Sequence, residues 1–203
     1  MSPKGILCVL ALVTILPLVL SYDFFITEGI RNYKFRYSAE NVYKFNVTEI
    51  DGKISSMNQY KNKTLIILNL PFSLEARRIY VLGLLFLKHY NKGLRIIGFP
   101  TDELTPGSHA DDKYNSPVFM RNYIRENQIK FQVYHKTLVN GPLAHPLWSY
   151  MKATFSLFDN CITNNYTMFI VDKRGIPVQR LPEDERPFFE EIEDAVVPYL
   201  YFQ

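Results

Sequence analysis

The chain has very few cysteines. Its 203 residues include two, Cys8 and Cys161, and Cys8 lies in an apolar N-terminal segment that we expect to be removed. The remaining chain would then hold one thiol and could form no internal disulfide. Such a lone cysteine is most often buried as a small hydrophobic residue; otherwise it pairs with another molecule or stays free and reactive.

An excess of charge of one sign is also lacking. Twenty-three basic residues face 20 acidic ones, a net charge of +3, and the basic residues are scattered along the chain. Nucleic-acid-binding domains concentrate Lys and Arg in patches or stripes, so we expect no nucleic-acid partner.

The sequence has no cysteine and histidine spacing typical of zinc sites. The weak exception is His109 with Asp111 and Asp112. We interpret this segment as a solvated loop, because the three residues lack the helix or strand spacing that would direct their side chains toward one metal ion. We therefore predict no metal site and no resident cofactor.

The first 21 residues have the layout of a signal peptide. Lys4 precedes an apolar stretch at 6–20, and small residues follow at the cleavage positions. A membrane-spanning helix needs about 20 apolar residues, but Pro17 and Asp23 interrupt this run. We predict cleavage of 1–21, secretion, and no stable membrane span; an uncleaved signal anchor is the alternative.

Three N-glycosylation sequons agree with secretion, beginning at Asn46, Asn62 and Asn165. Asn62 lies in a polar turn, so it is the favoured acceptor, together with Asn46. The C-terminus carries no retention tetrapeptide of the KDEL type, which makes export the expected route.

Beyond the signal we expect an irregular segment at 22–40 and one domain at 41–203. Apolar runs at 65–70 and 94–99 predict two strands buried on both faces. Between them, 75–90 predicts a deeply packed helix, because 81–87 is apolar nearly all round. The two strands and the helix should form a parallel, right-handed βαβ unit.

Other patterns predict shorter elements. They are a half-buried strand at 43–47, a hairpin turn at 51–52, a helix at 117–127, an extended piece at 130–134, a helix at 142–152, antiparallel strands at 167–172 and 176–180, and a last helix at 187–197 ended by Pro198. Parallel strands followed by a hairpin and a final helix are typical of an α/β, thioredoxin-like fold. Its mixed central sheet is flanked by helices.

Five stretches within 42–197 resemble, in order, the glutathione peroxidase family. They are YKFNVTEIDGKISSMNQY at 43–60, LNL at 68–70, KGLRIIGFP at 92–100, the LVNG…A.PL…K run at 138–152, and NYTMFIVDKRG at 165–175. The resemblance implies the family's architecture over nearly the whole mature chain.

The resemblance also shows what is missing. Family members reduce hydroperoxides with a cysteine or selenocysteine after the first strand, assisted by Gln, Trp and Asn. Here, counting forward from Asn69 places the nucleophile at Leu74, whereas counting back from Tyr80 places it at Ser73. The Gln position carries Glu103, the Trp position carries Asn164, and only Asn165 matches. A carboxylate at Glu103 would accept hydrogen bonds rather than donate them.

These substitutions predict a secreted member of the family that has lost hydroperoxide reduction. Its role would be structural, or it would bind an unknown protein or small-molecule ligand. The alternative is a thiol-dependent peroxidase or oxidoreductase acting through Cys161, three residues before Asn164, with glutathione or thioredoxin as co-substrate. Short connections at 127–135 and 152–164 resemble those of monomeric members, so we expect a monomer.

Overall fold

The computed structural model describes residues 40–104, 115–155, 161–181 and 189–201. The signal peptide predicted at 1–21, most of the segment at 22–40, and the loop holding His109 lie outside these residues. Within them, no helix is long and apolar enough to cross a bilayer.

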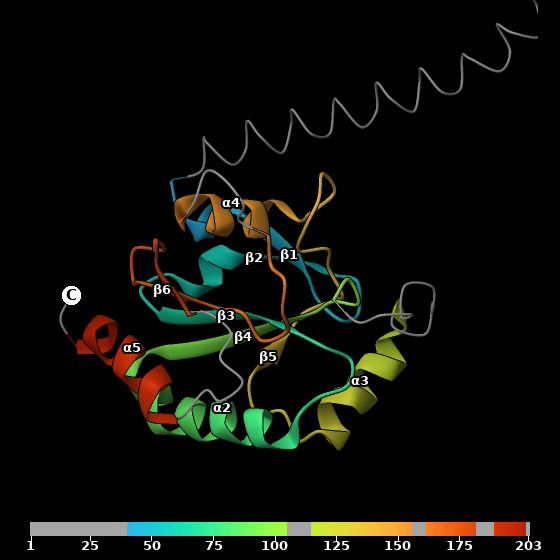
Figure 1. Cartoon of the computed structure of the whole chain (residues 1–203), viewed down its shortest axis with the longest axis horizontal. Helices are drawn as coiled ribbons and strands as arrows, with labels where there is room; N and C mark the ends of the chain where they lie inside the picture. Colours follow the sequence, from blue (N-terminus) through green and yellow to red (C-terminus); the bar gives the residue numbers. More distant parts are fainter. Residues whose placement is uncertain (1–39, 105–114, 156–160, 182–188, 202–203) are drawn as a thin grey trace, which may run out of the picture.

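A five-stranded mixed sheet forms the centre of the domain, in the order β5-β4-β3-β6-β7 (Figure 1). The strands are β3 (Thr64–Leu70), β4 (Leu94–Pro100), β5 (Gln132–Val133), β6 (Met168–Val171) and β7 (Pro177–Leu181). β3 runs parallel to β4 and β4 to β5, whereas β6 is antiparallel to both β3 and β7. The predicted βαβ unit and hairpin are therefore confirmed.

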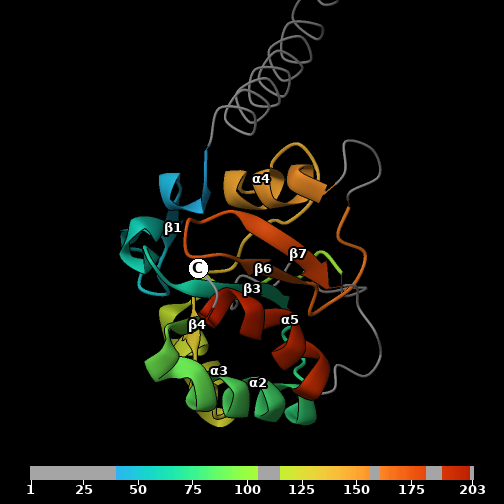
Figure 2. The ribbon, with the colours of Figure 1, turned by 90° about the vertical axis from the view of Figure 1, so that its left-hand side faces the viewer.

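Helices cover both faces of this sheet. Three lie on one side, α2 (Ala76–His89), α3 (Pro117–Glu126) and α5 (Phe189–Tyr201) (Figure 2). The other side holds α4 (Pro146–Phe155) and a small antiparallel hairpin of β1 (Asn46–Thr48) and β2 (Ile54–Ser56). Short 3-10 helices η1 (Val42–Lys44), η2 (Met57–Tyr60) and η3 (Tyr90–Lys92) complete the described chain.

β3 shows why the sheet needs cover on both faces. All seven of its residues are buried, and alternate side chains enter opposite layers, as the two-residue period of a strand requires. Ile66 and Leu68 pack with the layer of α2 and α5. Leu65 and Ile67 pack with the layer of α4. The continuous apolar run in the sequence is thus the signature of a central strand.

Four predicted elements differ from the structure by three residues or more at one end, or in their packing. In the first, the chain at 43–47 enters the strand only at Asn46. The Asn41 side chain accepts a hydrogen bond from the Tyr43 amide, and the Val42 amide donates to the Gly175 carbonyl. These contacts hold residues 42–44 in η1 against the β6–β7 turn.

In the second, the helix predicted at 142–152 begins at Pro146. Residues 142 and 143 instead form a turn, in which the Ala144 amide donates to the Gly141 carbonyl at 3.3 Å and Gly141 has a φ of +71°. His145 then occupies the N-cap position, with Pro146 at the first helical position, where a missing N–H costs nothing.

In the third, Pro198 does not end the last helix, and α5 continues to Tyr201. Proline removes one backbone hydrogen bond, but side chains from β3 and from the β6–β7 turn hold the final turn. Thr64 Oγ1 donates to the Tyr199 carbonyl at 2.8 Å, and Lys173 Nζ donates to the Leu200 carbonyl at 2.9 Å.

In the fourth, α2 is not packed on all sides. Tyr80, Leu84 and Leu87 are 67%, 41% and 62% exposed. The sheet and α5 pack against one side of α2, so the apolar sequence on its outer side remains at the surface.

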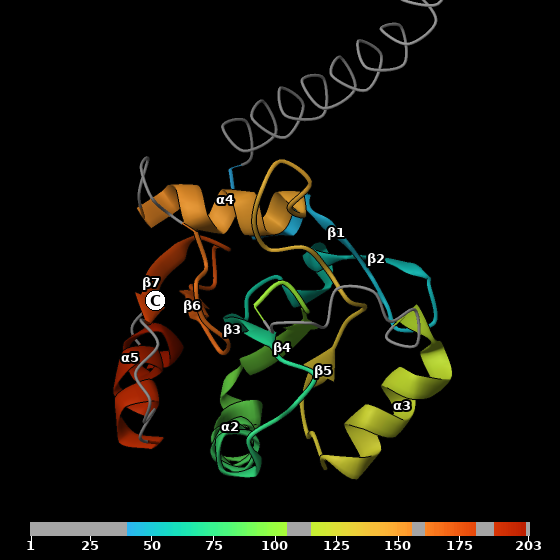
Figure 3. The ribbon, with the colours of Figure 1, turned by 45° about the vertical axis from the view of Figure 1, so that its right-hand side comes forward.

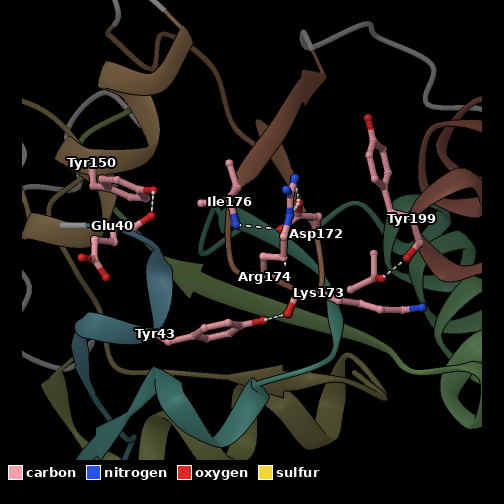
Figure 4. Close-up of polar contacts among 9 residues, drawn as sticks. Glu40, Tyr43, Tyr150, Asp172, Lys173, Arg174, Ile176 and Tyr199 are labelled. Atoms are coloured by element: carbon pink, nitrogen blue, oxygen red, sulfur yellow. Dashed lines mark hydrogen bonds and ion pairs between the residues drawn. The ribbon is translucent and has the colours of Figure 1, made fainter. Parts of the chain in front are cut away.

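A buried carboxylate organises the β6–β7 turn (Figure 4). Asp172 Oδ1 accepts hydrogen bonds at 2.9 Å from the amides of Arg174 and Ile176, and Oδ2 accepts one from Arg174 Nε at 2.9 Å. The hydroxyl of Tyr43 donates to the Lys173 carbonyl at 2.9 Å. Burial, with the charge of Asp172 second, raises the pKa of Tyr43 to about 12. Tyr43 therefore stays a neutral donor that joins the N-terminal segment to the turn.

Candidate functional site

The candidate site lies where the parallel strands β3 and β4 end. The Thr101 amide donates to the Leu70 carbonyl at 2.9 Å, which ties the two strand ends together. Asn69 Nδ2 donates to the Asn164 carbonyl at 3.1 Å, and the Tyr166 amide donates to the Asn69 carbonyl at 3.0 Å. The segment that carries Asn164 and Asn165 is thereby held beside the end of β3. Ligands of open α/β sheets characteristically bind outside the carboxyl ends of the strands.

The two possible nucleophile positions follow directly. Ser73 is exposed, and Leu74 is half-buried against the core on the α2 side. Two tyrosines hold the chain on either side of them. Tyr123 Oη donates to the Pro71 carbonyl, and the Glu75 amide donates to Tyr166 Oη, both at 2.8 Å.

Burial keeps both tyrosines neutral. It raises the pKa of Tyr123 far above its ordinary value and that of Tyr166 to about 12. The loop is thus fixed in place, but it presents a hydroxyl and an isobutyl group rather than a thiol.

Glu103 is committed to backbone hydrogen bonds. Its Oε2 accepts from the amides of Val139 and Asn140, the latter at 3.2 Å. Beside it, Asp102 pairs with Lys136 at 2.7 Å. The sequence-based expectation that a carboxylate here would accept hydrogen bonds is confirmed. Glu103 holds the 139–140 segment beneath the strand ends.

Asn140 and Lys152 extend this network. Lys152 Nζ donates to the Val139 carbonyl at 2.6 Å and to Asn140 Oδ1 at 3.3 Å. The Asn140 side chain also exchanges two bonds with the backbone of Ile162, at 2.7 and 2.8 Å. The sequence matched these residues to the family's motif but assigned them no role, because the burial of Lys152 is visible only in the structure.

Of the family positions, Asn164 and the adjacent Asn165 lie beside the end of β3, Ser73 and Leu74 follow that strand, and Glu103 follows β4. Asn165 is half-buried, and its Oδ1 has no hydrogen-bond partner among the described residues. Asn164 contributes its carbonyl, while the residue itself is exposed. Tyr166 has a φ of +63°, which turns the chain sharply after these two asparagines.

Cys161 is exposed. Its carbonyl accepts a hydrogen bond from Arg180 Nη2 at 2.9 Å, which brings a guanidinium near the cysteine backbone. Among the described residues, no group of His, Cys, Asp and Glu is arranged to hold a metal ion.

α4, which carries Lys152, depends on a histidine cap. His145 Nδ1 accepts a hydrogen bond from the Leu147 amide at 3.2 Å, as N-cap side chains do. Burial lowers the pKa of His145, although a backbone hydrogen bond at Asn46 opposes this effect. Folding therefore favours the neutral imidazole.

We expect this cap to make stability dependent on pH. Because the pKa of His145 is lowered on folding, the unfolded chain binds more protons below its own histidine pKa of about 6.5. The stabilisation is complete above that pH and is lost as the pH falls toward the folded pKa. Urea unfolding at pH 7 and pH 5 should show this loss, and His145→Asn, which keeps an acceptor without titrating, should reduce it. An equal pH dependence in the variant would contradict the assignment.

Comparisons with known proteins agree with this geometry. The sequence profile described as "Glutathione peroxidase" matches residues 42–152. The Bos taurus protein named "Phospholipid hydroperoxide glutathione peroxidase" is 31% identical over 157 residues, covering 73% of this chain and 76% of its own.

Solved structures give the same family and fold. The crystal structure of T. cruzi GPX1 is 26% identical with a TM-score of 0.62, covering 79% of this chain and 97% of its own. A Chlorobium tepidum thiol:disulfide interchange protein of the thioredoxin family has a TM-score of 0.54 at 18% identity, with 79% and 95% coverage, and supports the fold alone. The fold is thioredoxin-like, and the chain belongs to the glutathione peroxidase family.

Proposed function

We propose that this protein is a secreted, monomeric family member that no longer reduces hydroperoxides and acts by binding a partner or as a structural component. One observation carries the proposal: the chain between β3 and α2 offers Ser73 and Leu74 where the family's chemistry requires a thiol or selenol. A thiolate attacks peroxide oxygen and is recycled by other thiols. A serine hydroxyl is far less acidic, and leucine has no reactive group.

The surroundings of this position support the same proposal. Glu103 places a carboxylate, with its oxygen used by backbone amides, where the family has an amide donor. Asn164 supplies no indole N–H. Restoring one residue should therefore restore little, because the catalytic groups act as a set.

We expect purified protein spanning residues 22–203 to show no turnover of hydrogen peroxide or a lipid hydroperoxide with glutathione or thioredoxin. Leu74→Cys and Ser73→Cys should remain at the level of a denatured control, because the donor groups are absent. NADPH-coupled assays of both co-substrates would measure this. Clear turnover by the unmodified chain would refute the proposal.

A second candidate function rests on the exposure of Cys161. Its thiolate could attack a hydroperoxide to give a sulfenic acid and release an alcohol or water, and two glutathione molecules would then restore the thiol. Cys161→Ser should abolish any such turnover. Labelling of the folded protein with a maleimide tests the thiol directly, and an unreactive Cys161 would exclude this route.

Secretion and glycosylation belong to the same proposal. Asn46 and Asn62 are exposed, and Asn62 lies in a turn with φ of +64°; at Asn165, by contrast, the side-chain oxygen is buried. Expression of the full chain in animal cells should release a protein beginning near Tyr22, with glycans lost from Asn46→Gln and Asn62→Gln but unchanged in Asn165→Gln. Retention in the membrane fraction would favour the signal anchor.

A further inference from the structure

The outer side of α2 carries an apolar stripe that the described part of the fold leaves exposed. Tyr80, Leu84 and Leu87 follow one another at intervals of four and three residues, which places them on one face of the helix. Tyr80 and Leu87 are each more than three-fifths exposed. Contiguous apolar surface rimmed by polar residues commonly marks a binding site.

The stripe forms one wall of a groove of about 420 Å³. Ile79 and Gly83 also line it, and the opposite wall comes from the end of α3 and the chain that follows, including Glu126 and Lys130. Figure 3 shows this chain leaving α3 toward β5 beside α2, which is seen nearly along its axis. A β-carbon at Gly83 would lie 3.6 Å from Lys130 Cγ, so the aliphatic stem of Lys130 lies across from this glycine.

The two walls differ in chemistry. The α2 wall is apolar, whereas the wall at 126–130 offers amides and charged groups. Glu126 Oε1 lies 3.9 Å from Arg125 Nη2, so the Glu126 carboxylate has a basic partner. Lys130, by contrast, has no acidic partner among the described residues. A complementary ligand would therefore be apolar on one side and polar on the other, with a negative group near Lys130.

We propose that this groove binds an amphipathic α-helix of another protein, whose apolar side chains contact the α2 stripe and whose acidic residue meets Lys130. Helices bind apolar grooves through residues at such spacing. The stripe from Tyr80 to Leu87 is about 10 Å long at 1.5 Å per residue, which suits two turns of helix. Such a helix would be the partner that the proposed binding role leaves open, and its binding does not depend on the loss of peroxide chemistry.

Shape argues against a bilayer as the occupant, because a broad lipid surface would have to enter a concave groove that the single side chains of a helix can fill. A second copy pairing its stripe antiparallel with this one would bring Arg77 near Lys88 of the other copy, but Lys88 is already paired with Glu193 at 2.7 Å. Charge therefore does not exclude such a dimer, and the oligomeric state is measured as an outcome of the test.

The test uses a fluorescent synthetic peptide of about four helical turns, with leucines at helical spacing and glutamates at the polar positions. The control peptide has lysines in place of the glutamates. We expect saturable binding of the glutamate peptide in fluorescence anisotropy, weakened about tenfold by Leu84→Gln or Leu87→Gln. Lys130→Glu should reverse the preference between the two peptides. Ile54→Gln, which alters a side chain as exposed as Leu87 on the distant β2, should change nothing.

Several outcomes would overturn the inference. They are equal affinity for both peptides, affinity unaffected by Leu84→Gln, or no binding to either peptide. Sedimentation showing a dimer that Leu87→Gln dissociates would assign the groove to a second copy. Binding to phosphatidylserine vesicles without peptide binding would assign it to a membrane. Peroxide turnover is measured separately, so an active enzyme that binds the peptide would refute only the proposed loss of catalysis.

Discussion

Asp172→Ala is expected to lower the free energy of unfolding by about 2–4 kcal/mol, because it removes the acceptor of two backbone amides, and each donor left without a partner costs about 1–3 kcal/mol. The Asp172 carboxylate is fully buried. Alanine would leave the amides of Arg174 and Ile176 without these acceptors and would remove the partner of the Arg174 guanidinium. Urea unfolding followed by tryptophan fluorescence would measure the change.

Asp51 supplies a matched control. It also accepts a hydrogen bond from a backbone amide two residues ahead, that of Lys53, at 3.1 Å, but in an exposed hairpin turn. Water can replace that acceptor, so Asp51→Ala should cost about 1 kcal/mol or less. Asp172→Asn should fall between the two, because its amide keeps one oxygen acceptor. If Asp172→Ala costs no more than Asp51→Ala, the proposed role of the buried carboxylate is wrong.

Trp148→Ala is expected to have a similarly large effect, about 3–5 kcal/mol, as for other aromatic side chains removed from a core. Trp148 is fully buried. Its ring makes edge contacts with Phe99 and Phe169, at centroid distances of 5.8 and 6.0 Å. These contacts join α4 to β4 and β6, so their loss should also loosen the helix that carries Lys152. Thermal unfolding followed by circular dichroism would measure the effect, since this variant has no tryptophan.

Trp148→Phe separates packing from hydrogen bonding. The indole Nε1 has no hydrogen-bond partner among the described residues, so phenylalanine sacrifices volume but no polar contact. We expect it to recover more than half of the stability lost in Trp148→Ala. Equal losses in the two variants would contradict the proposed role of ring packing, since phenylalanine restores most of the aromatic contact.

Much of the fold could be read from local patterns. The apolar run of β3 identified a central strand because both faces of that strand are covered. Ser116 accepts a hydrogen bond from the Phe119 amide with Pro117 following it, so the start of α3 matched its capping signal. Gly52, with φ of +89°, allowed the predicted hairpin turn. Each of these signals acts within a few residues.

The sequence-based predictions were wrong for segments whose structure depends on residues distant in the sequence. Pro198 was expected to end the last helix, but Thr64 and Lys173 hold the turn that continues beyond it. The sequence at 81–87 was apolar on every side, yet only the sheet-facing side of α2 is covered. Local patterns contain no information about which neighbours will cover a helix.

The sequence by itself determined that this chain has the family's ordered motifs and lacks a thiol at Ser73 and Leu74, because both depend only on residue identity and spacing. Only the tertiary structure decided what the altered positions do instead. Glu103 became an acceptor for the amides of Val139 and Asn140, since folding brings that segment to the end of β4. The structure likewise left the α2 groove open, because no described element packs against that side of the helix.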